Sequence, residues 1–338
     1  MNHKTTYRVL ALTDHTDHSI ENSIYALLRQ MVQHERCAEL LVASRGLREN
    51  AAFFQHHQAD QLWAAKVGAD FQFTESGQSF QQLLRPVDPT QFDLVLLRLP
   101  RPLKDSFLEF LADLLPNTAM INHPRGILRT SNKAFLLHFP EVCPPMRLVR
   151  SVQEVLDYAE QFPIVLKPLR EYGGRGILKL IDGKVDDGTA QYPAFDFLTK
   201  LEDTLQQEGM LAMQFLKNVS QGDKRIIVVD GEIMAASLRL PAPDSWLCNV
   251  AQGGTSVATQ ITEEERALIA QINPRLRQEG ILIYGVDTLV DDEGKRVLSE
   301  VNTLSIGGFP QAQAQSGRPI IIETIEKIFH YLDTFYGH

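Results

Sequence analysis

The feature that most constrains the fold is the stretch from residue 281 to 308, where two extended runs flank a polar turn. The first run is apolar and rich in β-branched and aromatic residues, and a single acid, Asp287, interrupts it. Two such runs around a short glycine-containing turn predict a β-hairpin. The turn places Asp287 roughly opposite Ser299–Glu300. Because strand side chains alternate between faces, Glu300 and Asn302 share one face and can point toward Asp287.

Two carboxylates and one amide oxygen on one face form the kind of ligand set that Mg²⁺ prefers, with nucleotide phosphates completing the octahedron. The alternative is a hairpin whose acids lie on a solvated face. Asp287 is awkward for that alternative, since it lies in an apolar run and a buried carboxylate needs a partner. The hairpin alone leaves both interpretations open.

Length and composition limit the class of protein. A chain of 338 residues is long enough for two or three domains with a sizeable core. Its 33 basic and 42 acidic residues give a net charge of −9, which argues against a general nucleic-acid binder. The three cysteines are far apart and form no CxxC pair, as expected in a reducing cytosol. With no signal-peptide pattern and no apolar run near the ~18 residues of a membrane span, we expect a soluble, cytoplasmic protein without a membrane partner.

The first third of the chain alternates strand-like and helix-like segments, which indicates a parallel α/β layer. The expected strands are residues 8–13, 39–43, 93–99 and 119–122, and the expected helix is 20–33. Residues 50–82 show weak periodicity, and the pattern makes no prediction for them. The histidines at 15, 18, 56 and 57 are interpreted as surface residues, because no further ligand stands at metal spacing.

A glycine-rich loop follows an apolar strand in the middle of the chain. The strand, residues 163–169, ends near Lys167, and the loop Arg170–Gly176 leads into a returning strand at residues 177–181. Bare backbone N–H groups in such a turn can hold phosphate, and Lys167 places a cation beside them. The loop is not a Walker A motif, and an ordinary hairpin turn is the commoner explanation.

The remaining segments surround the first hairpin. We expect a helix at residues 195–207, strands at 210–216, 226–230 and 233–239, and helices at 262–278 and 320–332. The helix from residue 262 has a capping box, Thr262 to Glu265, and a stop at Gly280. Arg225 and Arg239 fall near matching ends of an antiparallel pair, where solvated arginine is the ordinary interpretation.

Taken together, these pieces resemble the ATP-grasp superfamily, and within it bacterial glutathione synthetase. The segments that carry the resemblance are Asn122–Lys133, Ile164–Gly176, Met213–Gly231, Arg239–Pro241, Asn249–Gly254 and Gly285–Ser305. The resemblance covers about residues 90–335. The GDKR-to-VVDG run and the acid, acid, Asn hairpin are specific when they occur in this order, whereas the glycine loop alone is not.

The resemblance implies a role for each matching residue. Lys133 and Lys167 would hold ATP phosphates under a lid formed by Gly173, Gly174 and Gly176. The strand Gln214, Phe215 and Leu216 would meet adenine, and Asp223 the ribose. Asp287, Glu300 and Asn302 would ligate two Mg²⁺ ions, or Mn²⁺ in their place. Arg225, Arg239 and Ser305 would hold the acyl substrate, with Asn249, Gly253 and Gly254 in a loop near the reacting phosphate; Arg225, Arg239, Asn249 and Gly254 would be the catalytic group.

The sequence also departs from the family pattern. Arg170 and Glu171 stand where the family usually has Asp and Gly, and Arg175 replaces a small residue. The segment 303–308 replaces the usual Val-Thr-Ser-Pro-Thr, and residues 252–256 lack Gly-Gly-Arg-Gly. These segments border the substrate pockets, so they bear on which acid and amine are joined.

We therefore expect an α/β protein of ATP-grasp fold, in which two α+β lobes grip the nucleotide. Residues 1–125 would form an N-terminal parallel α/β domain, 126–207 the central lobe with the lid, and 208–338 the C-terminal lobe with the metal and acyl sites. The expected activity is an ATP- and Mg²⁺-dependent carboxylate–amine ligase acting through an acyl phosphate, with small-molecule substrates and a homo-oligomeric assembly. The alternatives are a related peptide ligase with other substrates and a nucleotide-binding regulator without turnover.

Overall fold

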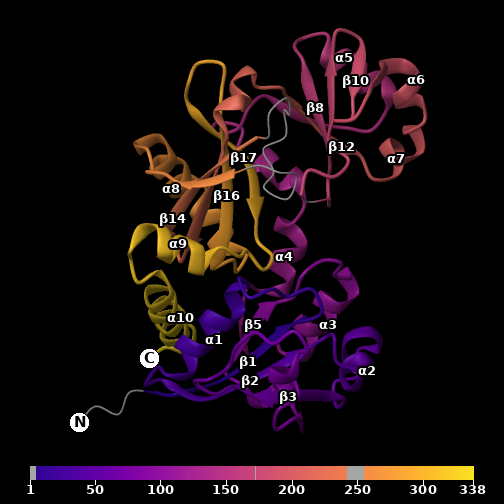
Figure 1. Ribbon diagram of the computed structural model, residues 1–338. Helices are drawn as coiled ribbons and strands as arrows, with labels where there is room; N and C mark the ends of the chain where they lie inside the picture. The colour runs from indigo at the N-terminus through magenta and orange to yellow at the C-terminus, as the bar shows by residue number, and fades with distance from the viewer. Residues whose placement is uncertain (1–4, 172, 242–254) are drawn as a thin grey trace.

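The described part of the chain forms three β-sheets that follow one another in sequence. The computed structural model describes residues 5–171, 173–241 and 255–338. Figure 1 shows the N-terminal sheet at the bottom of the view, the second sheet at the upper right and the third at the upper left. The last helix, α10 (Ile320–Tyr336), runs back from the third sheet to the N-terminal one.

The N-terminal sheet has the strand order β4-β3-β2-β1-β5-β6. Its strands are β1 (Tyr7–Thr13), β2 (Cys37–Ser44), β3 (Leu62–Lys66), β4 (Arg85–Val87), β5 (Leu94–Arg98) and β6 (Ala119–Ile121). The pairs β1–β2, β1–β5 and β5–β6 are parallel, which confirms the expected parallel layer. β3 and β4 add an antiparallel edge, and β3 comes from the segment for which the sequence pattern makes no prediction.

Alternate residues of β1 enter two different cores, as the strand period requires. Val9 and Ala11 pack in a core with α1 (Ser23–Val32) and α10. Leu10 and Leu12 pack in the other core, which contains residues of α2 (Ala51–His56) and α3 (Asp105–Leu114). The sheet is therefore covered on both faces, as parallel sheets usually are.

The second sheet is antiparallel, in the order β11-β10-β9-β8-β12-β7. Its elements are β7 (Met146–Val149), α5 (Val152–Ala159), β8 (Ile164–Pro168), β9 (Leu178–Ile181), β10 (Lys184–Asp186), β11 (Gln191–Pro193), α6 (Ala194–Thr199), α7 (Glu202–Gln207) and β12 (Met210–Gln214). β12 lies between β8 and β7, so the second sheet ends at Gln214. The predicted boundary at residue 207 is too early, because β12 completes the second sheet instead of opening the third.

The third sheet is also antiparallel, in the order β15-β14-β13-β16-β17. Its strands are β13 (Asp223–Val229), β14 (Glu232–Leu240), β15 (Thr255–Ala258), β16 (Ile283–Val290) and β17 (Arg296–Asn302). The short helix η5 (Lys217–Gln221) leads into it, and α8 (Glu263–Gln278) begins at the predicted capping box of Thr262 and Glu265. β16 and β17 form the predicted hairpin, with Asp287 paired to Glu300.

One buried side chain ties the N-terminal sheet to the third sheet. The Asn122 amide donates to the carbonyl oxygens of Ile283 and Thr303, at 2.6 and 2.7 Å. Its oxygen accepts the backbone N–H groups of Leu282 and Ile283, each at 2.9 Å. All the hydrogen-bonding capacity of the Asn122 side chain is used across this junction. The other helices are α4 (Pro124–Thr130), α9 (Phe309–Ser316) and the short helices η1 (Arg48–Asn50), η2 (Gln78–Phe80), η3 (Pro89–Gln91) and η4 (Lys133–His138). Within the described residues, every helix is too short or too polar to cross a membrane.

Candidate active site

A cavity of about 170 Å³ opens between the second and third sheets. The predicted site residues that line it are Lys167, Gly173, Gly174, Gln214, Phe215, Leu216, Asp223, Arg225, Arg239, Asp287, Glu300 and Asn302. They come from β8, the glycine loop, β12 and the segment after it, and from β13, β14, β16 and β17. Segments far apart in the sequence thus converge on one space.

The structure does not bring every predicted residue to this cavity. Lys133 lines a small adjoining space that it shares with Glu300. Gly176 has a left-handed φ of 68° but is not part of the lining. The Ser305 hydroxyl donates to the Leu99 carbonyl oxygen at 2.7 Å, facing the N-terminal domain. The predicted residues Asn249, Gly253 and Gly254 lie outside the described part of the chain.

The hairpin places two carboxylates opposite each other, with an amide two residues farther along β17. Asp287 and Glu300 are register partners, and Asn302 pairs with Gly285, two positions away in the register. The Asn302 amide nitrogen lies 3.3 Å from Asp287 Oδ2, so the amide oxygen remains available as an acceptor. In residues 5–171, 173–241 and 255–338, no three His, Cys, Asp or Glu side chains gather at metal-binding distance. A set of two carboxylates and an amide fits Mg²⁺, which also takes water and phosphate oxygens.

A bulge in β17 connects this hairpin to the second sheet. Asp287 pairs with Glu300 while Thr288 pairs with Leu298, which leaves Ser299 as the extra residue. The Ser299 carbonyl oxygen accepts a hydrogen bond from Lys167 Nζ at 3.2 Å. The hairpin and the lysine predicted to hold phosphate therefore touch directly.

Two arginines surround Asp287, which is only 3% exposed. Arg225 Nε and Nη2 bind its two carboxylate oxygens, the latter at 2.8 Å. Arg239 Nη2 lies 3.0 Å from Asp287 Oδ2, and Arg239 Nε and Nη2 donate to the two carboxylate oxygens of Asp223 at 2.8 and 2.5 Å. The arginines are therefore the partners that the buried acid requires, and they are not solvated on an open face.

Burial and charge shift the pKa values of these acids in opposite directions. Burial alone would raise the pKa of Asp287, but the Arg225 and Arg239 guanidinium groups outweigh it and lower that pKa to about 2. Burial and the charge of Asp287 raise the pKa of Asp223 to about 7, against the opposing effect of Arg239. Asp287 therefore carries its negative charge at neutral pH, as a metal ligand must.

Two lysines approach the hairpin from the other side. Lys167 is 8% exposed, and burial lowers its pKa while the nearby Glu300 charge opposes this change. Lys133 Nζ lies 3.7 Å from Glu300 Oε1 and donates to the Glu171 carbonyl oxygen. Both cations therefore lie beside the predicted metal ligands, where they can meet the phosphates of a nucleotide.

The apolar wall of the cavity was missed by sequence reasoning. It consists of Val165, Ile177, Met213, Val219 and Leu289. Val165 stands two residues before Lys167 on β8, and Leu289 two residues after Asp287 on β16. The period of two along these strands is the signal that could have identified them. An apolar slot beside Phe215 suits the flat face of a nucleobase.

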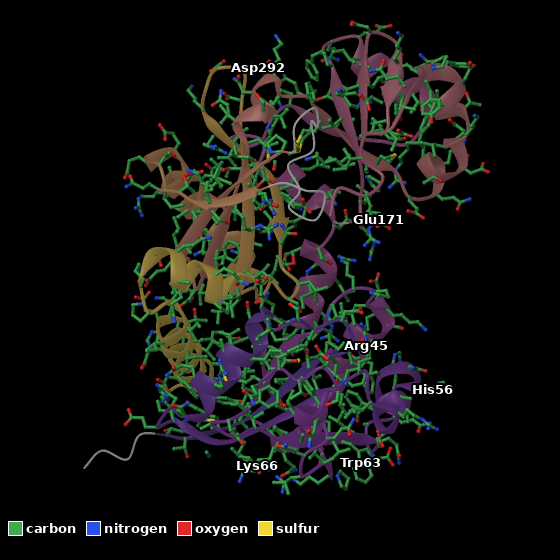
Figure 2. All side chains as sticks on the ribbon, viewed as in Figure 1. Arg45, His56, Trp63, Lys66, Glu171 and Asp292 are labelled. Atoms are coloured by element: carbon green, nitrogen blue, oxygen red, sulfur yellow. The ribbon has the colours of Figure 1, made fainter. Side chains whose placement is uncertain are left out.

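The glycine-rich loop contacts the N-terminal domain through Arg170, a residue that departs from the family pattern. Arg170 Nη1 binds both oxygens of Asp105, the first residue of α3, at 2.9 and 2.7 Å. The two side chains are 52% and 50% exposed. Figure 2 labels the neighbouring Glu171 at the lower end of the second lobe, facing the N-terminal domain.

Comparison with known proteins adds independent information on this arrangement. The family model described as the prokaryotic glutathione synthetase ATP-grasp domain matches residues 132–317. A glutathione synthetase of Bradyrhizobium diazoefficiens is 31% identical over 244 residues, which are 70% of this chain and 73% of that protein. One from Rhodopseudomonas palustris is 32% identical over 243 residues, 71% of this chain and 73% of its own length.

Solved structures are similar over nearly the whole chain. The D-cycloserine synthetase DcsG superposes with a TM-score of 0.65 at 15% identity, over 96% of this chain and 99% of its own. The D-alanyl-alanine synthetase A of Vibrio cholerae gives 0.59 at 13% identity, over 97% and 99%. At these identities the likeness concerns the fold, and it extends beyond the matched family segment to the N-terminal sheet.

Proposed function

The chain belongs to the prokaryotic glutathione synthetase family, with the ATP-grasp fold of ATP-dependent ligases that form carbon–nitrogen bonds, and from this premise we propose that its product is glutathione. The proposed reaction joins γ-glutamylcysteine to glycine and converts ATP to ADP and phosphate. The observation that supports it most is the cavity between the second and third sheets, in which paired carboxylates, arginines and lysines face an apolar slot.

The first step proposed is activation of the acyl substrate. A carboxylate oxygen of γ-glutamylcysteine attacks the γ-phosphorus of ATP, a phosphorus–oxygen bond to ADP breaks, and an acyl phosphate forms. Lys133 and Lys167 would bind the phosphoryl oxygens that gain charge. Asp287, Glu300 and Asn302 would hold Mg²⁺, which neutralises phosphate charge and orients the oxygens.

The second step proposed is amide formation. The glycine nitrogen attacks the acyl carbon, the carbon–oxygen bond to phosphate breaks, and the proton lost by the amine passes to the released phosphate or to solvent. Arg225 and Arg239, which line the cavity, would bind the substrate carboxylate and the oxyanion formed from it. No acid–base dyad or nucleophilic side chain is needed, since ATP supplies the leaving group.

The nucleotide would lie across the apolar slot. Val165, Met213 and Leu289 would contact the base beside the segment Gln214–Leu216, and Asp223 would reach the ribose. In the structure Asp223 is bound to Arg239, so a ribose contact requires the carboxylate to share its oxygens. Gly173 and Gly174, with φ values of 66° and 76°, supply lid backbone that L side chains rarely match.

The experiment that tests this proposal is ADP release with ATP, Mg²⁺ and γ-glutamylcysteine, measured with and without glycine. We expect release that depends on both substrates, with glutathione identified by mass. Release that occurs only with another dipeptide or amino acid would keep the ligase and refute glutathione as the product. A related ligase with other substrates is the second candidate, favoured by the replaced segment 303–308 and by the Ser305 hydroxyl facing away from the cavity.

Three further expectations accompany this function. We propose that the chain assembles as a homo-oligomer, that it acts in the cytoplasm, and that Mn²⁺ can replace Mg²⁺. Sedimentation of the purified protein and ADP release with each metal would test the first and the third.

A further inference from the structure

A second cavity lies within the N-terminal domain, and it shares no lining residue with the cavity between the second and third sheets. It has a volume of about 360 Å³, in the range of small-molecule sites. The turn that follows β2 and the segment that follows η2 contribute to its wall, and so does His15, two residues after β1. We refer to it as the N-terminal cavity.

The imidazole of His15 is held in one orientation by Ser44, the last residue of β2. Ser44 is 0% exposed, and its Oγ accepts the backbone N–H groups of His15 and Gly46, at 3.1 and 3.2 Å. Both lone pairs of the hydroxyl are then used, so its hydrogen is donated to His15 Nδ1, 2.6 Å away. Burial lowers the pKa of His15 against the opposing charge of Asp14, which keeps the ring neutral. The ring proton is therefore on Nε2.

The His15 ring also has a close packing environment. It stacks on Phe80, with a centroid distance of 4.7 Å and an interplanar angle of 20°. A Cβ atom on Gly77, whose φ is 67°, would lie 2.4 Å from Nε2, and one on Gly46 would lie 3.1 Å from Cε1. In the part of the chain that the structure describes, Nε2 has no hydrogen-bond partner. His15 therefore offers the N-terminal cavity one oriented, neutral N–H donor.

The turn that carries the charges of the N-terminal cavity is fixed as well. Arg48 and Glu49 belong to η1, whose last residue is Asn50. The Asn50 side chain is 0% exposed, and its amide donates to the carbonyl oxygens of Ser44 and Trp63, at 2.9 and 3.0 Å. Its oxygen accepts the Trp63 backbone N–H at 2.7 Å. The turn is thereby tied to both β2 and β3.

Charges of both signs line the N-terminal cavity. Within residues 5–171, 173–241 and 255–338, the side chains of Arg48, Glu49 and Gln81 form no hydrogen bond or ion pair. A guanidinium matches a carboxylate through two parallel hydrogen bonds, and a carboxylate matches an ammonium group. Leu47 and Leu84 supply an apolar part of the wall. Solvated surface charge would account for Arg48 and Glu49 alone, but not for an oriented imidazole donor beside them.

We propose that the N-terminal cavity binds the α-amino acid head group of a free amino acid or of a short peptide. Arg48 and the His15 Nε2–H bind the carboxylate, and Glu49 binds the ammonium group. Leu47 and Leu84 contact the rest of the ligand. The site is separate from the ligase cavity, so this inference goes beyond the proposed function and does not depend on it.

The experiment measures binding by calorimetry at two temperatures, with the full chain and without ATP. Leucine is the probe in one arm and glutathione, whose γ-glutamyl residue has a free α-amino acid head group, in the other. We expect one of them to bind, and we expect Arg48→Gln and Glu49→Gln each to weaken its binding about 10-fold. Lys66→Gln is the matched control, because Lys66 is exposed and lies on the opposite side of the domain from Arg45, the neighbour of Gly46 (Figure 2).

Analogues of the probe assign each charge to its partner. Isocaproate lacks the ammonium group of leucine, and leucinamide lacks its carboxylate; glutaryl-cysteinyl-glycine and γ-aminobutyryl-cysteinyl-glycine serve the glutathione arm in the same way. Each analogue should bind the wild type about 10-fold more weakly than its parent. Arg48→Gln should not weaken binding of the analogue without the carboxylate any further, and Glu49→Gln should not weaken binding of the analogue without the ammonium group.

Two outcomes would overturn the proposal. One is the absence of binding by either probe at about 10 mM, a concentration that fills most of a site with a Kd of about 1 mM. The other is binding that Arg48→Gln and Glu49→Gln both leave unchanged, which would place the ligand in the ligase cavity or elsewhere. Because binding is measured without turnover, either outcome is distinguishable from a failure of the proposed ligase reaction.

Discussion

Two neighbouring residues of β13 form ion pairs on opposite faces of the third sheet, and only one pair belongs to a site. Lys224 Nζ binds Glu265 Oε2 at 2.7 Å, with side chains 4% and 0% exposed. Arg225, the next residue, binds Asp287, which is 4% exposed at its side chain. Strand alternation sends the first pair against α8 and the second toward the cavity.

The two pairs differ in what surrounds them and not in burial alone. Both carboxylate oxygens of Glu265 have hydrogen-bond partners. Oε1 accepts from the Thr288 hydroxyl at 2.9 Å, and Oε2 accepts from the Thr262 backbone N–H at 2.9 Å and from Lys224 Nζ. Asp287 faces a cavity and is approached by a second arginine, Arg239. A buried ion pair is therefore a weak indicator of function by itself, whereas one that borders an open space with further charges is a strong indicator.

The largest expected effect is on stability, at the buried pair of Lys224 and Glu265. Lys224→Met leaves the Glu265 charge buried without a cation and should lower the free energy of unfolding by about 3–5 kcal/mol. The turnover number of the protein that remains folded should stay within about twofold, because Lys224 does not line the cavity. Urea unfolding and ADP release per folded molecule measure the two quantities.

Replacing both partners is the control. Lys224→Met combined with Glu265→Leu removes both charges, and it should recover part of the loss, since a buried pair can be exchanged for apolar residues of similar volume. A fall in turnover of the folded fraction would contradict the division between a structural and a functional face.

Glu300→Gln should lower activity and leave stability nearly unchanged, the reverse of what we expect for Lys224→Met. It removes a charge from the predicted metal ligands, and it should reduce ADP formation about 10²- to 10³-fold or abolish it. The change in the free energy of unfolding should be small, since Glu300 is 30% exposed at its side chain. Turnover at the wild-type rate, with Mg²⁺ binding unchanged by calorimetry, would show that the metal assignment is wrong.

Arg239→Lys tests the charged cluster that borders the cavity, in which Arg239 binds Asp223 and Asp287. Lysine cannot bind Asp223 through two parallel hydrogen bonds while also meeting Asp287. We expect kcat/KM for the acyl substrate to fall about 10- to 100-fold, equivalent to about 1.4–2.7 kcal/mol. The KM for ATP should change much less, and an equal change in both constants would place Arg239 with the nucleotide instead.

Much of this comparison could be predicted from the sequence, because it follows from local pattern. The hairpin, the capping box of α8 and the parallel centre of the N-terminal sheet depend on strand and helix periods that neighbouring residues set. The acid in the apolar run, Asp287, correctly required a partner. The resemblance to a family then connected segments that no local pattern could bring together.

What could not be predicted depends on distant contacts. The pairing of β12 with β7 and β8 depends on sheet assembly, so local pattern predicts a lobe boundary that is too early. The family resemblance predicts Ser305 in the acyl site, whereas its hydroxyl binds the Leu99 carbonyl oxygen of the N-terminal domain.

The smallest expected effect concerns the exposed ion pair between Arg170 and Asp105, which links the glycine-rich loop to the N-terminal domain. An exposed pair contributes about 0.2–1 kcal/mol, and salt screens it. Arg170→Gln should therefore raise the KM for ATP by no more than about fivefold at low salt and by less at high salt, where the wild-type KM should approach that of the variant. Asp105→Asn should match it, and the exchanged pair Arg170→Asp with Asp105→Arg should restore the wild-type KM. A salt-independent change of tenfold or more in the KM for ATP would mean that Arg170 binds the nucleotide directly. The glycine-rich loop would then be part of the nucleotide site and not only a surface contact.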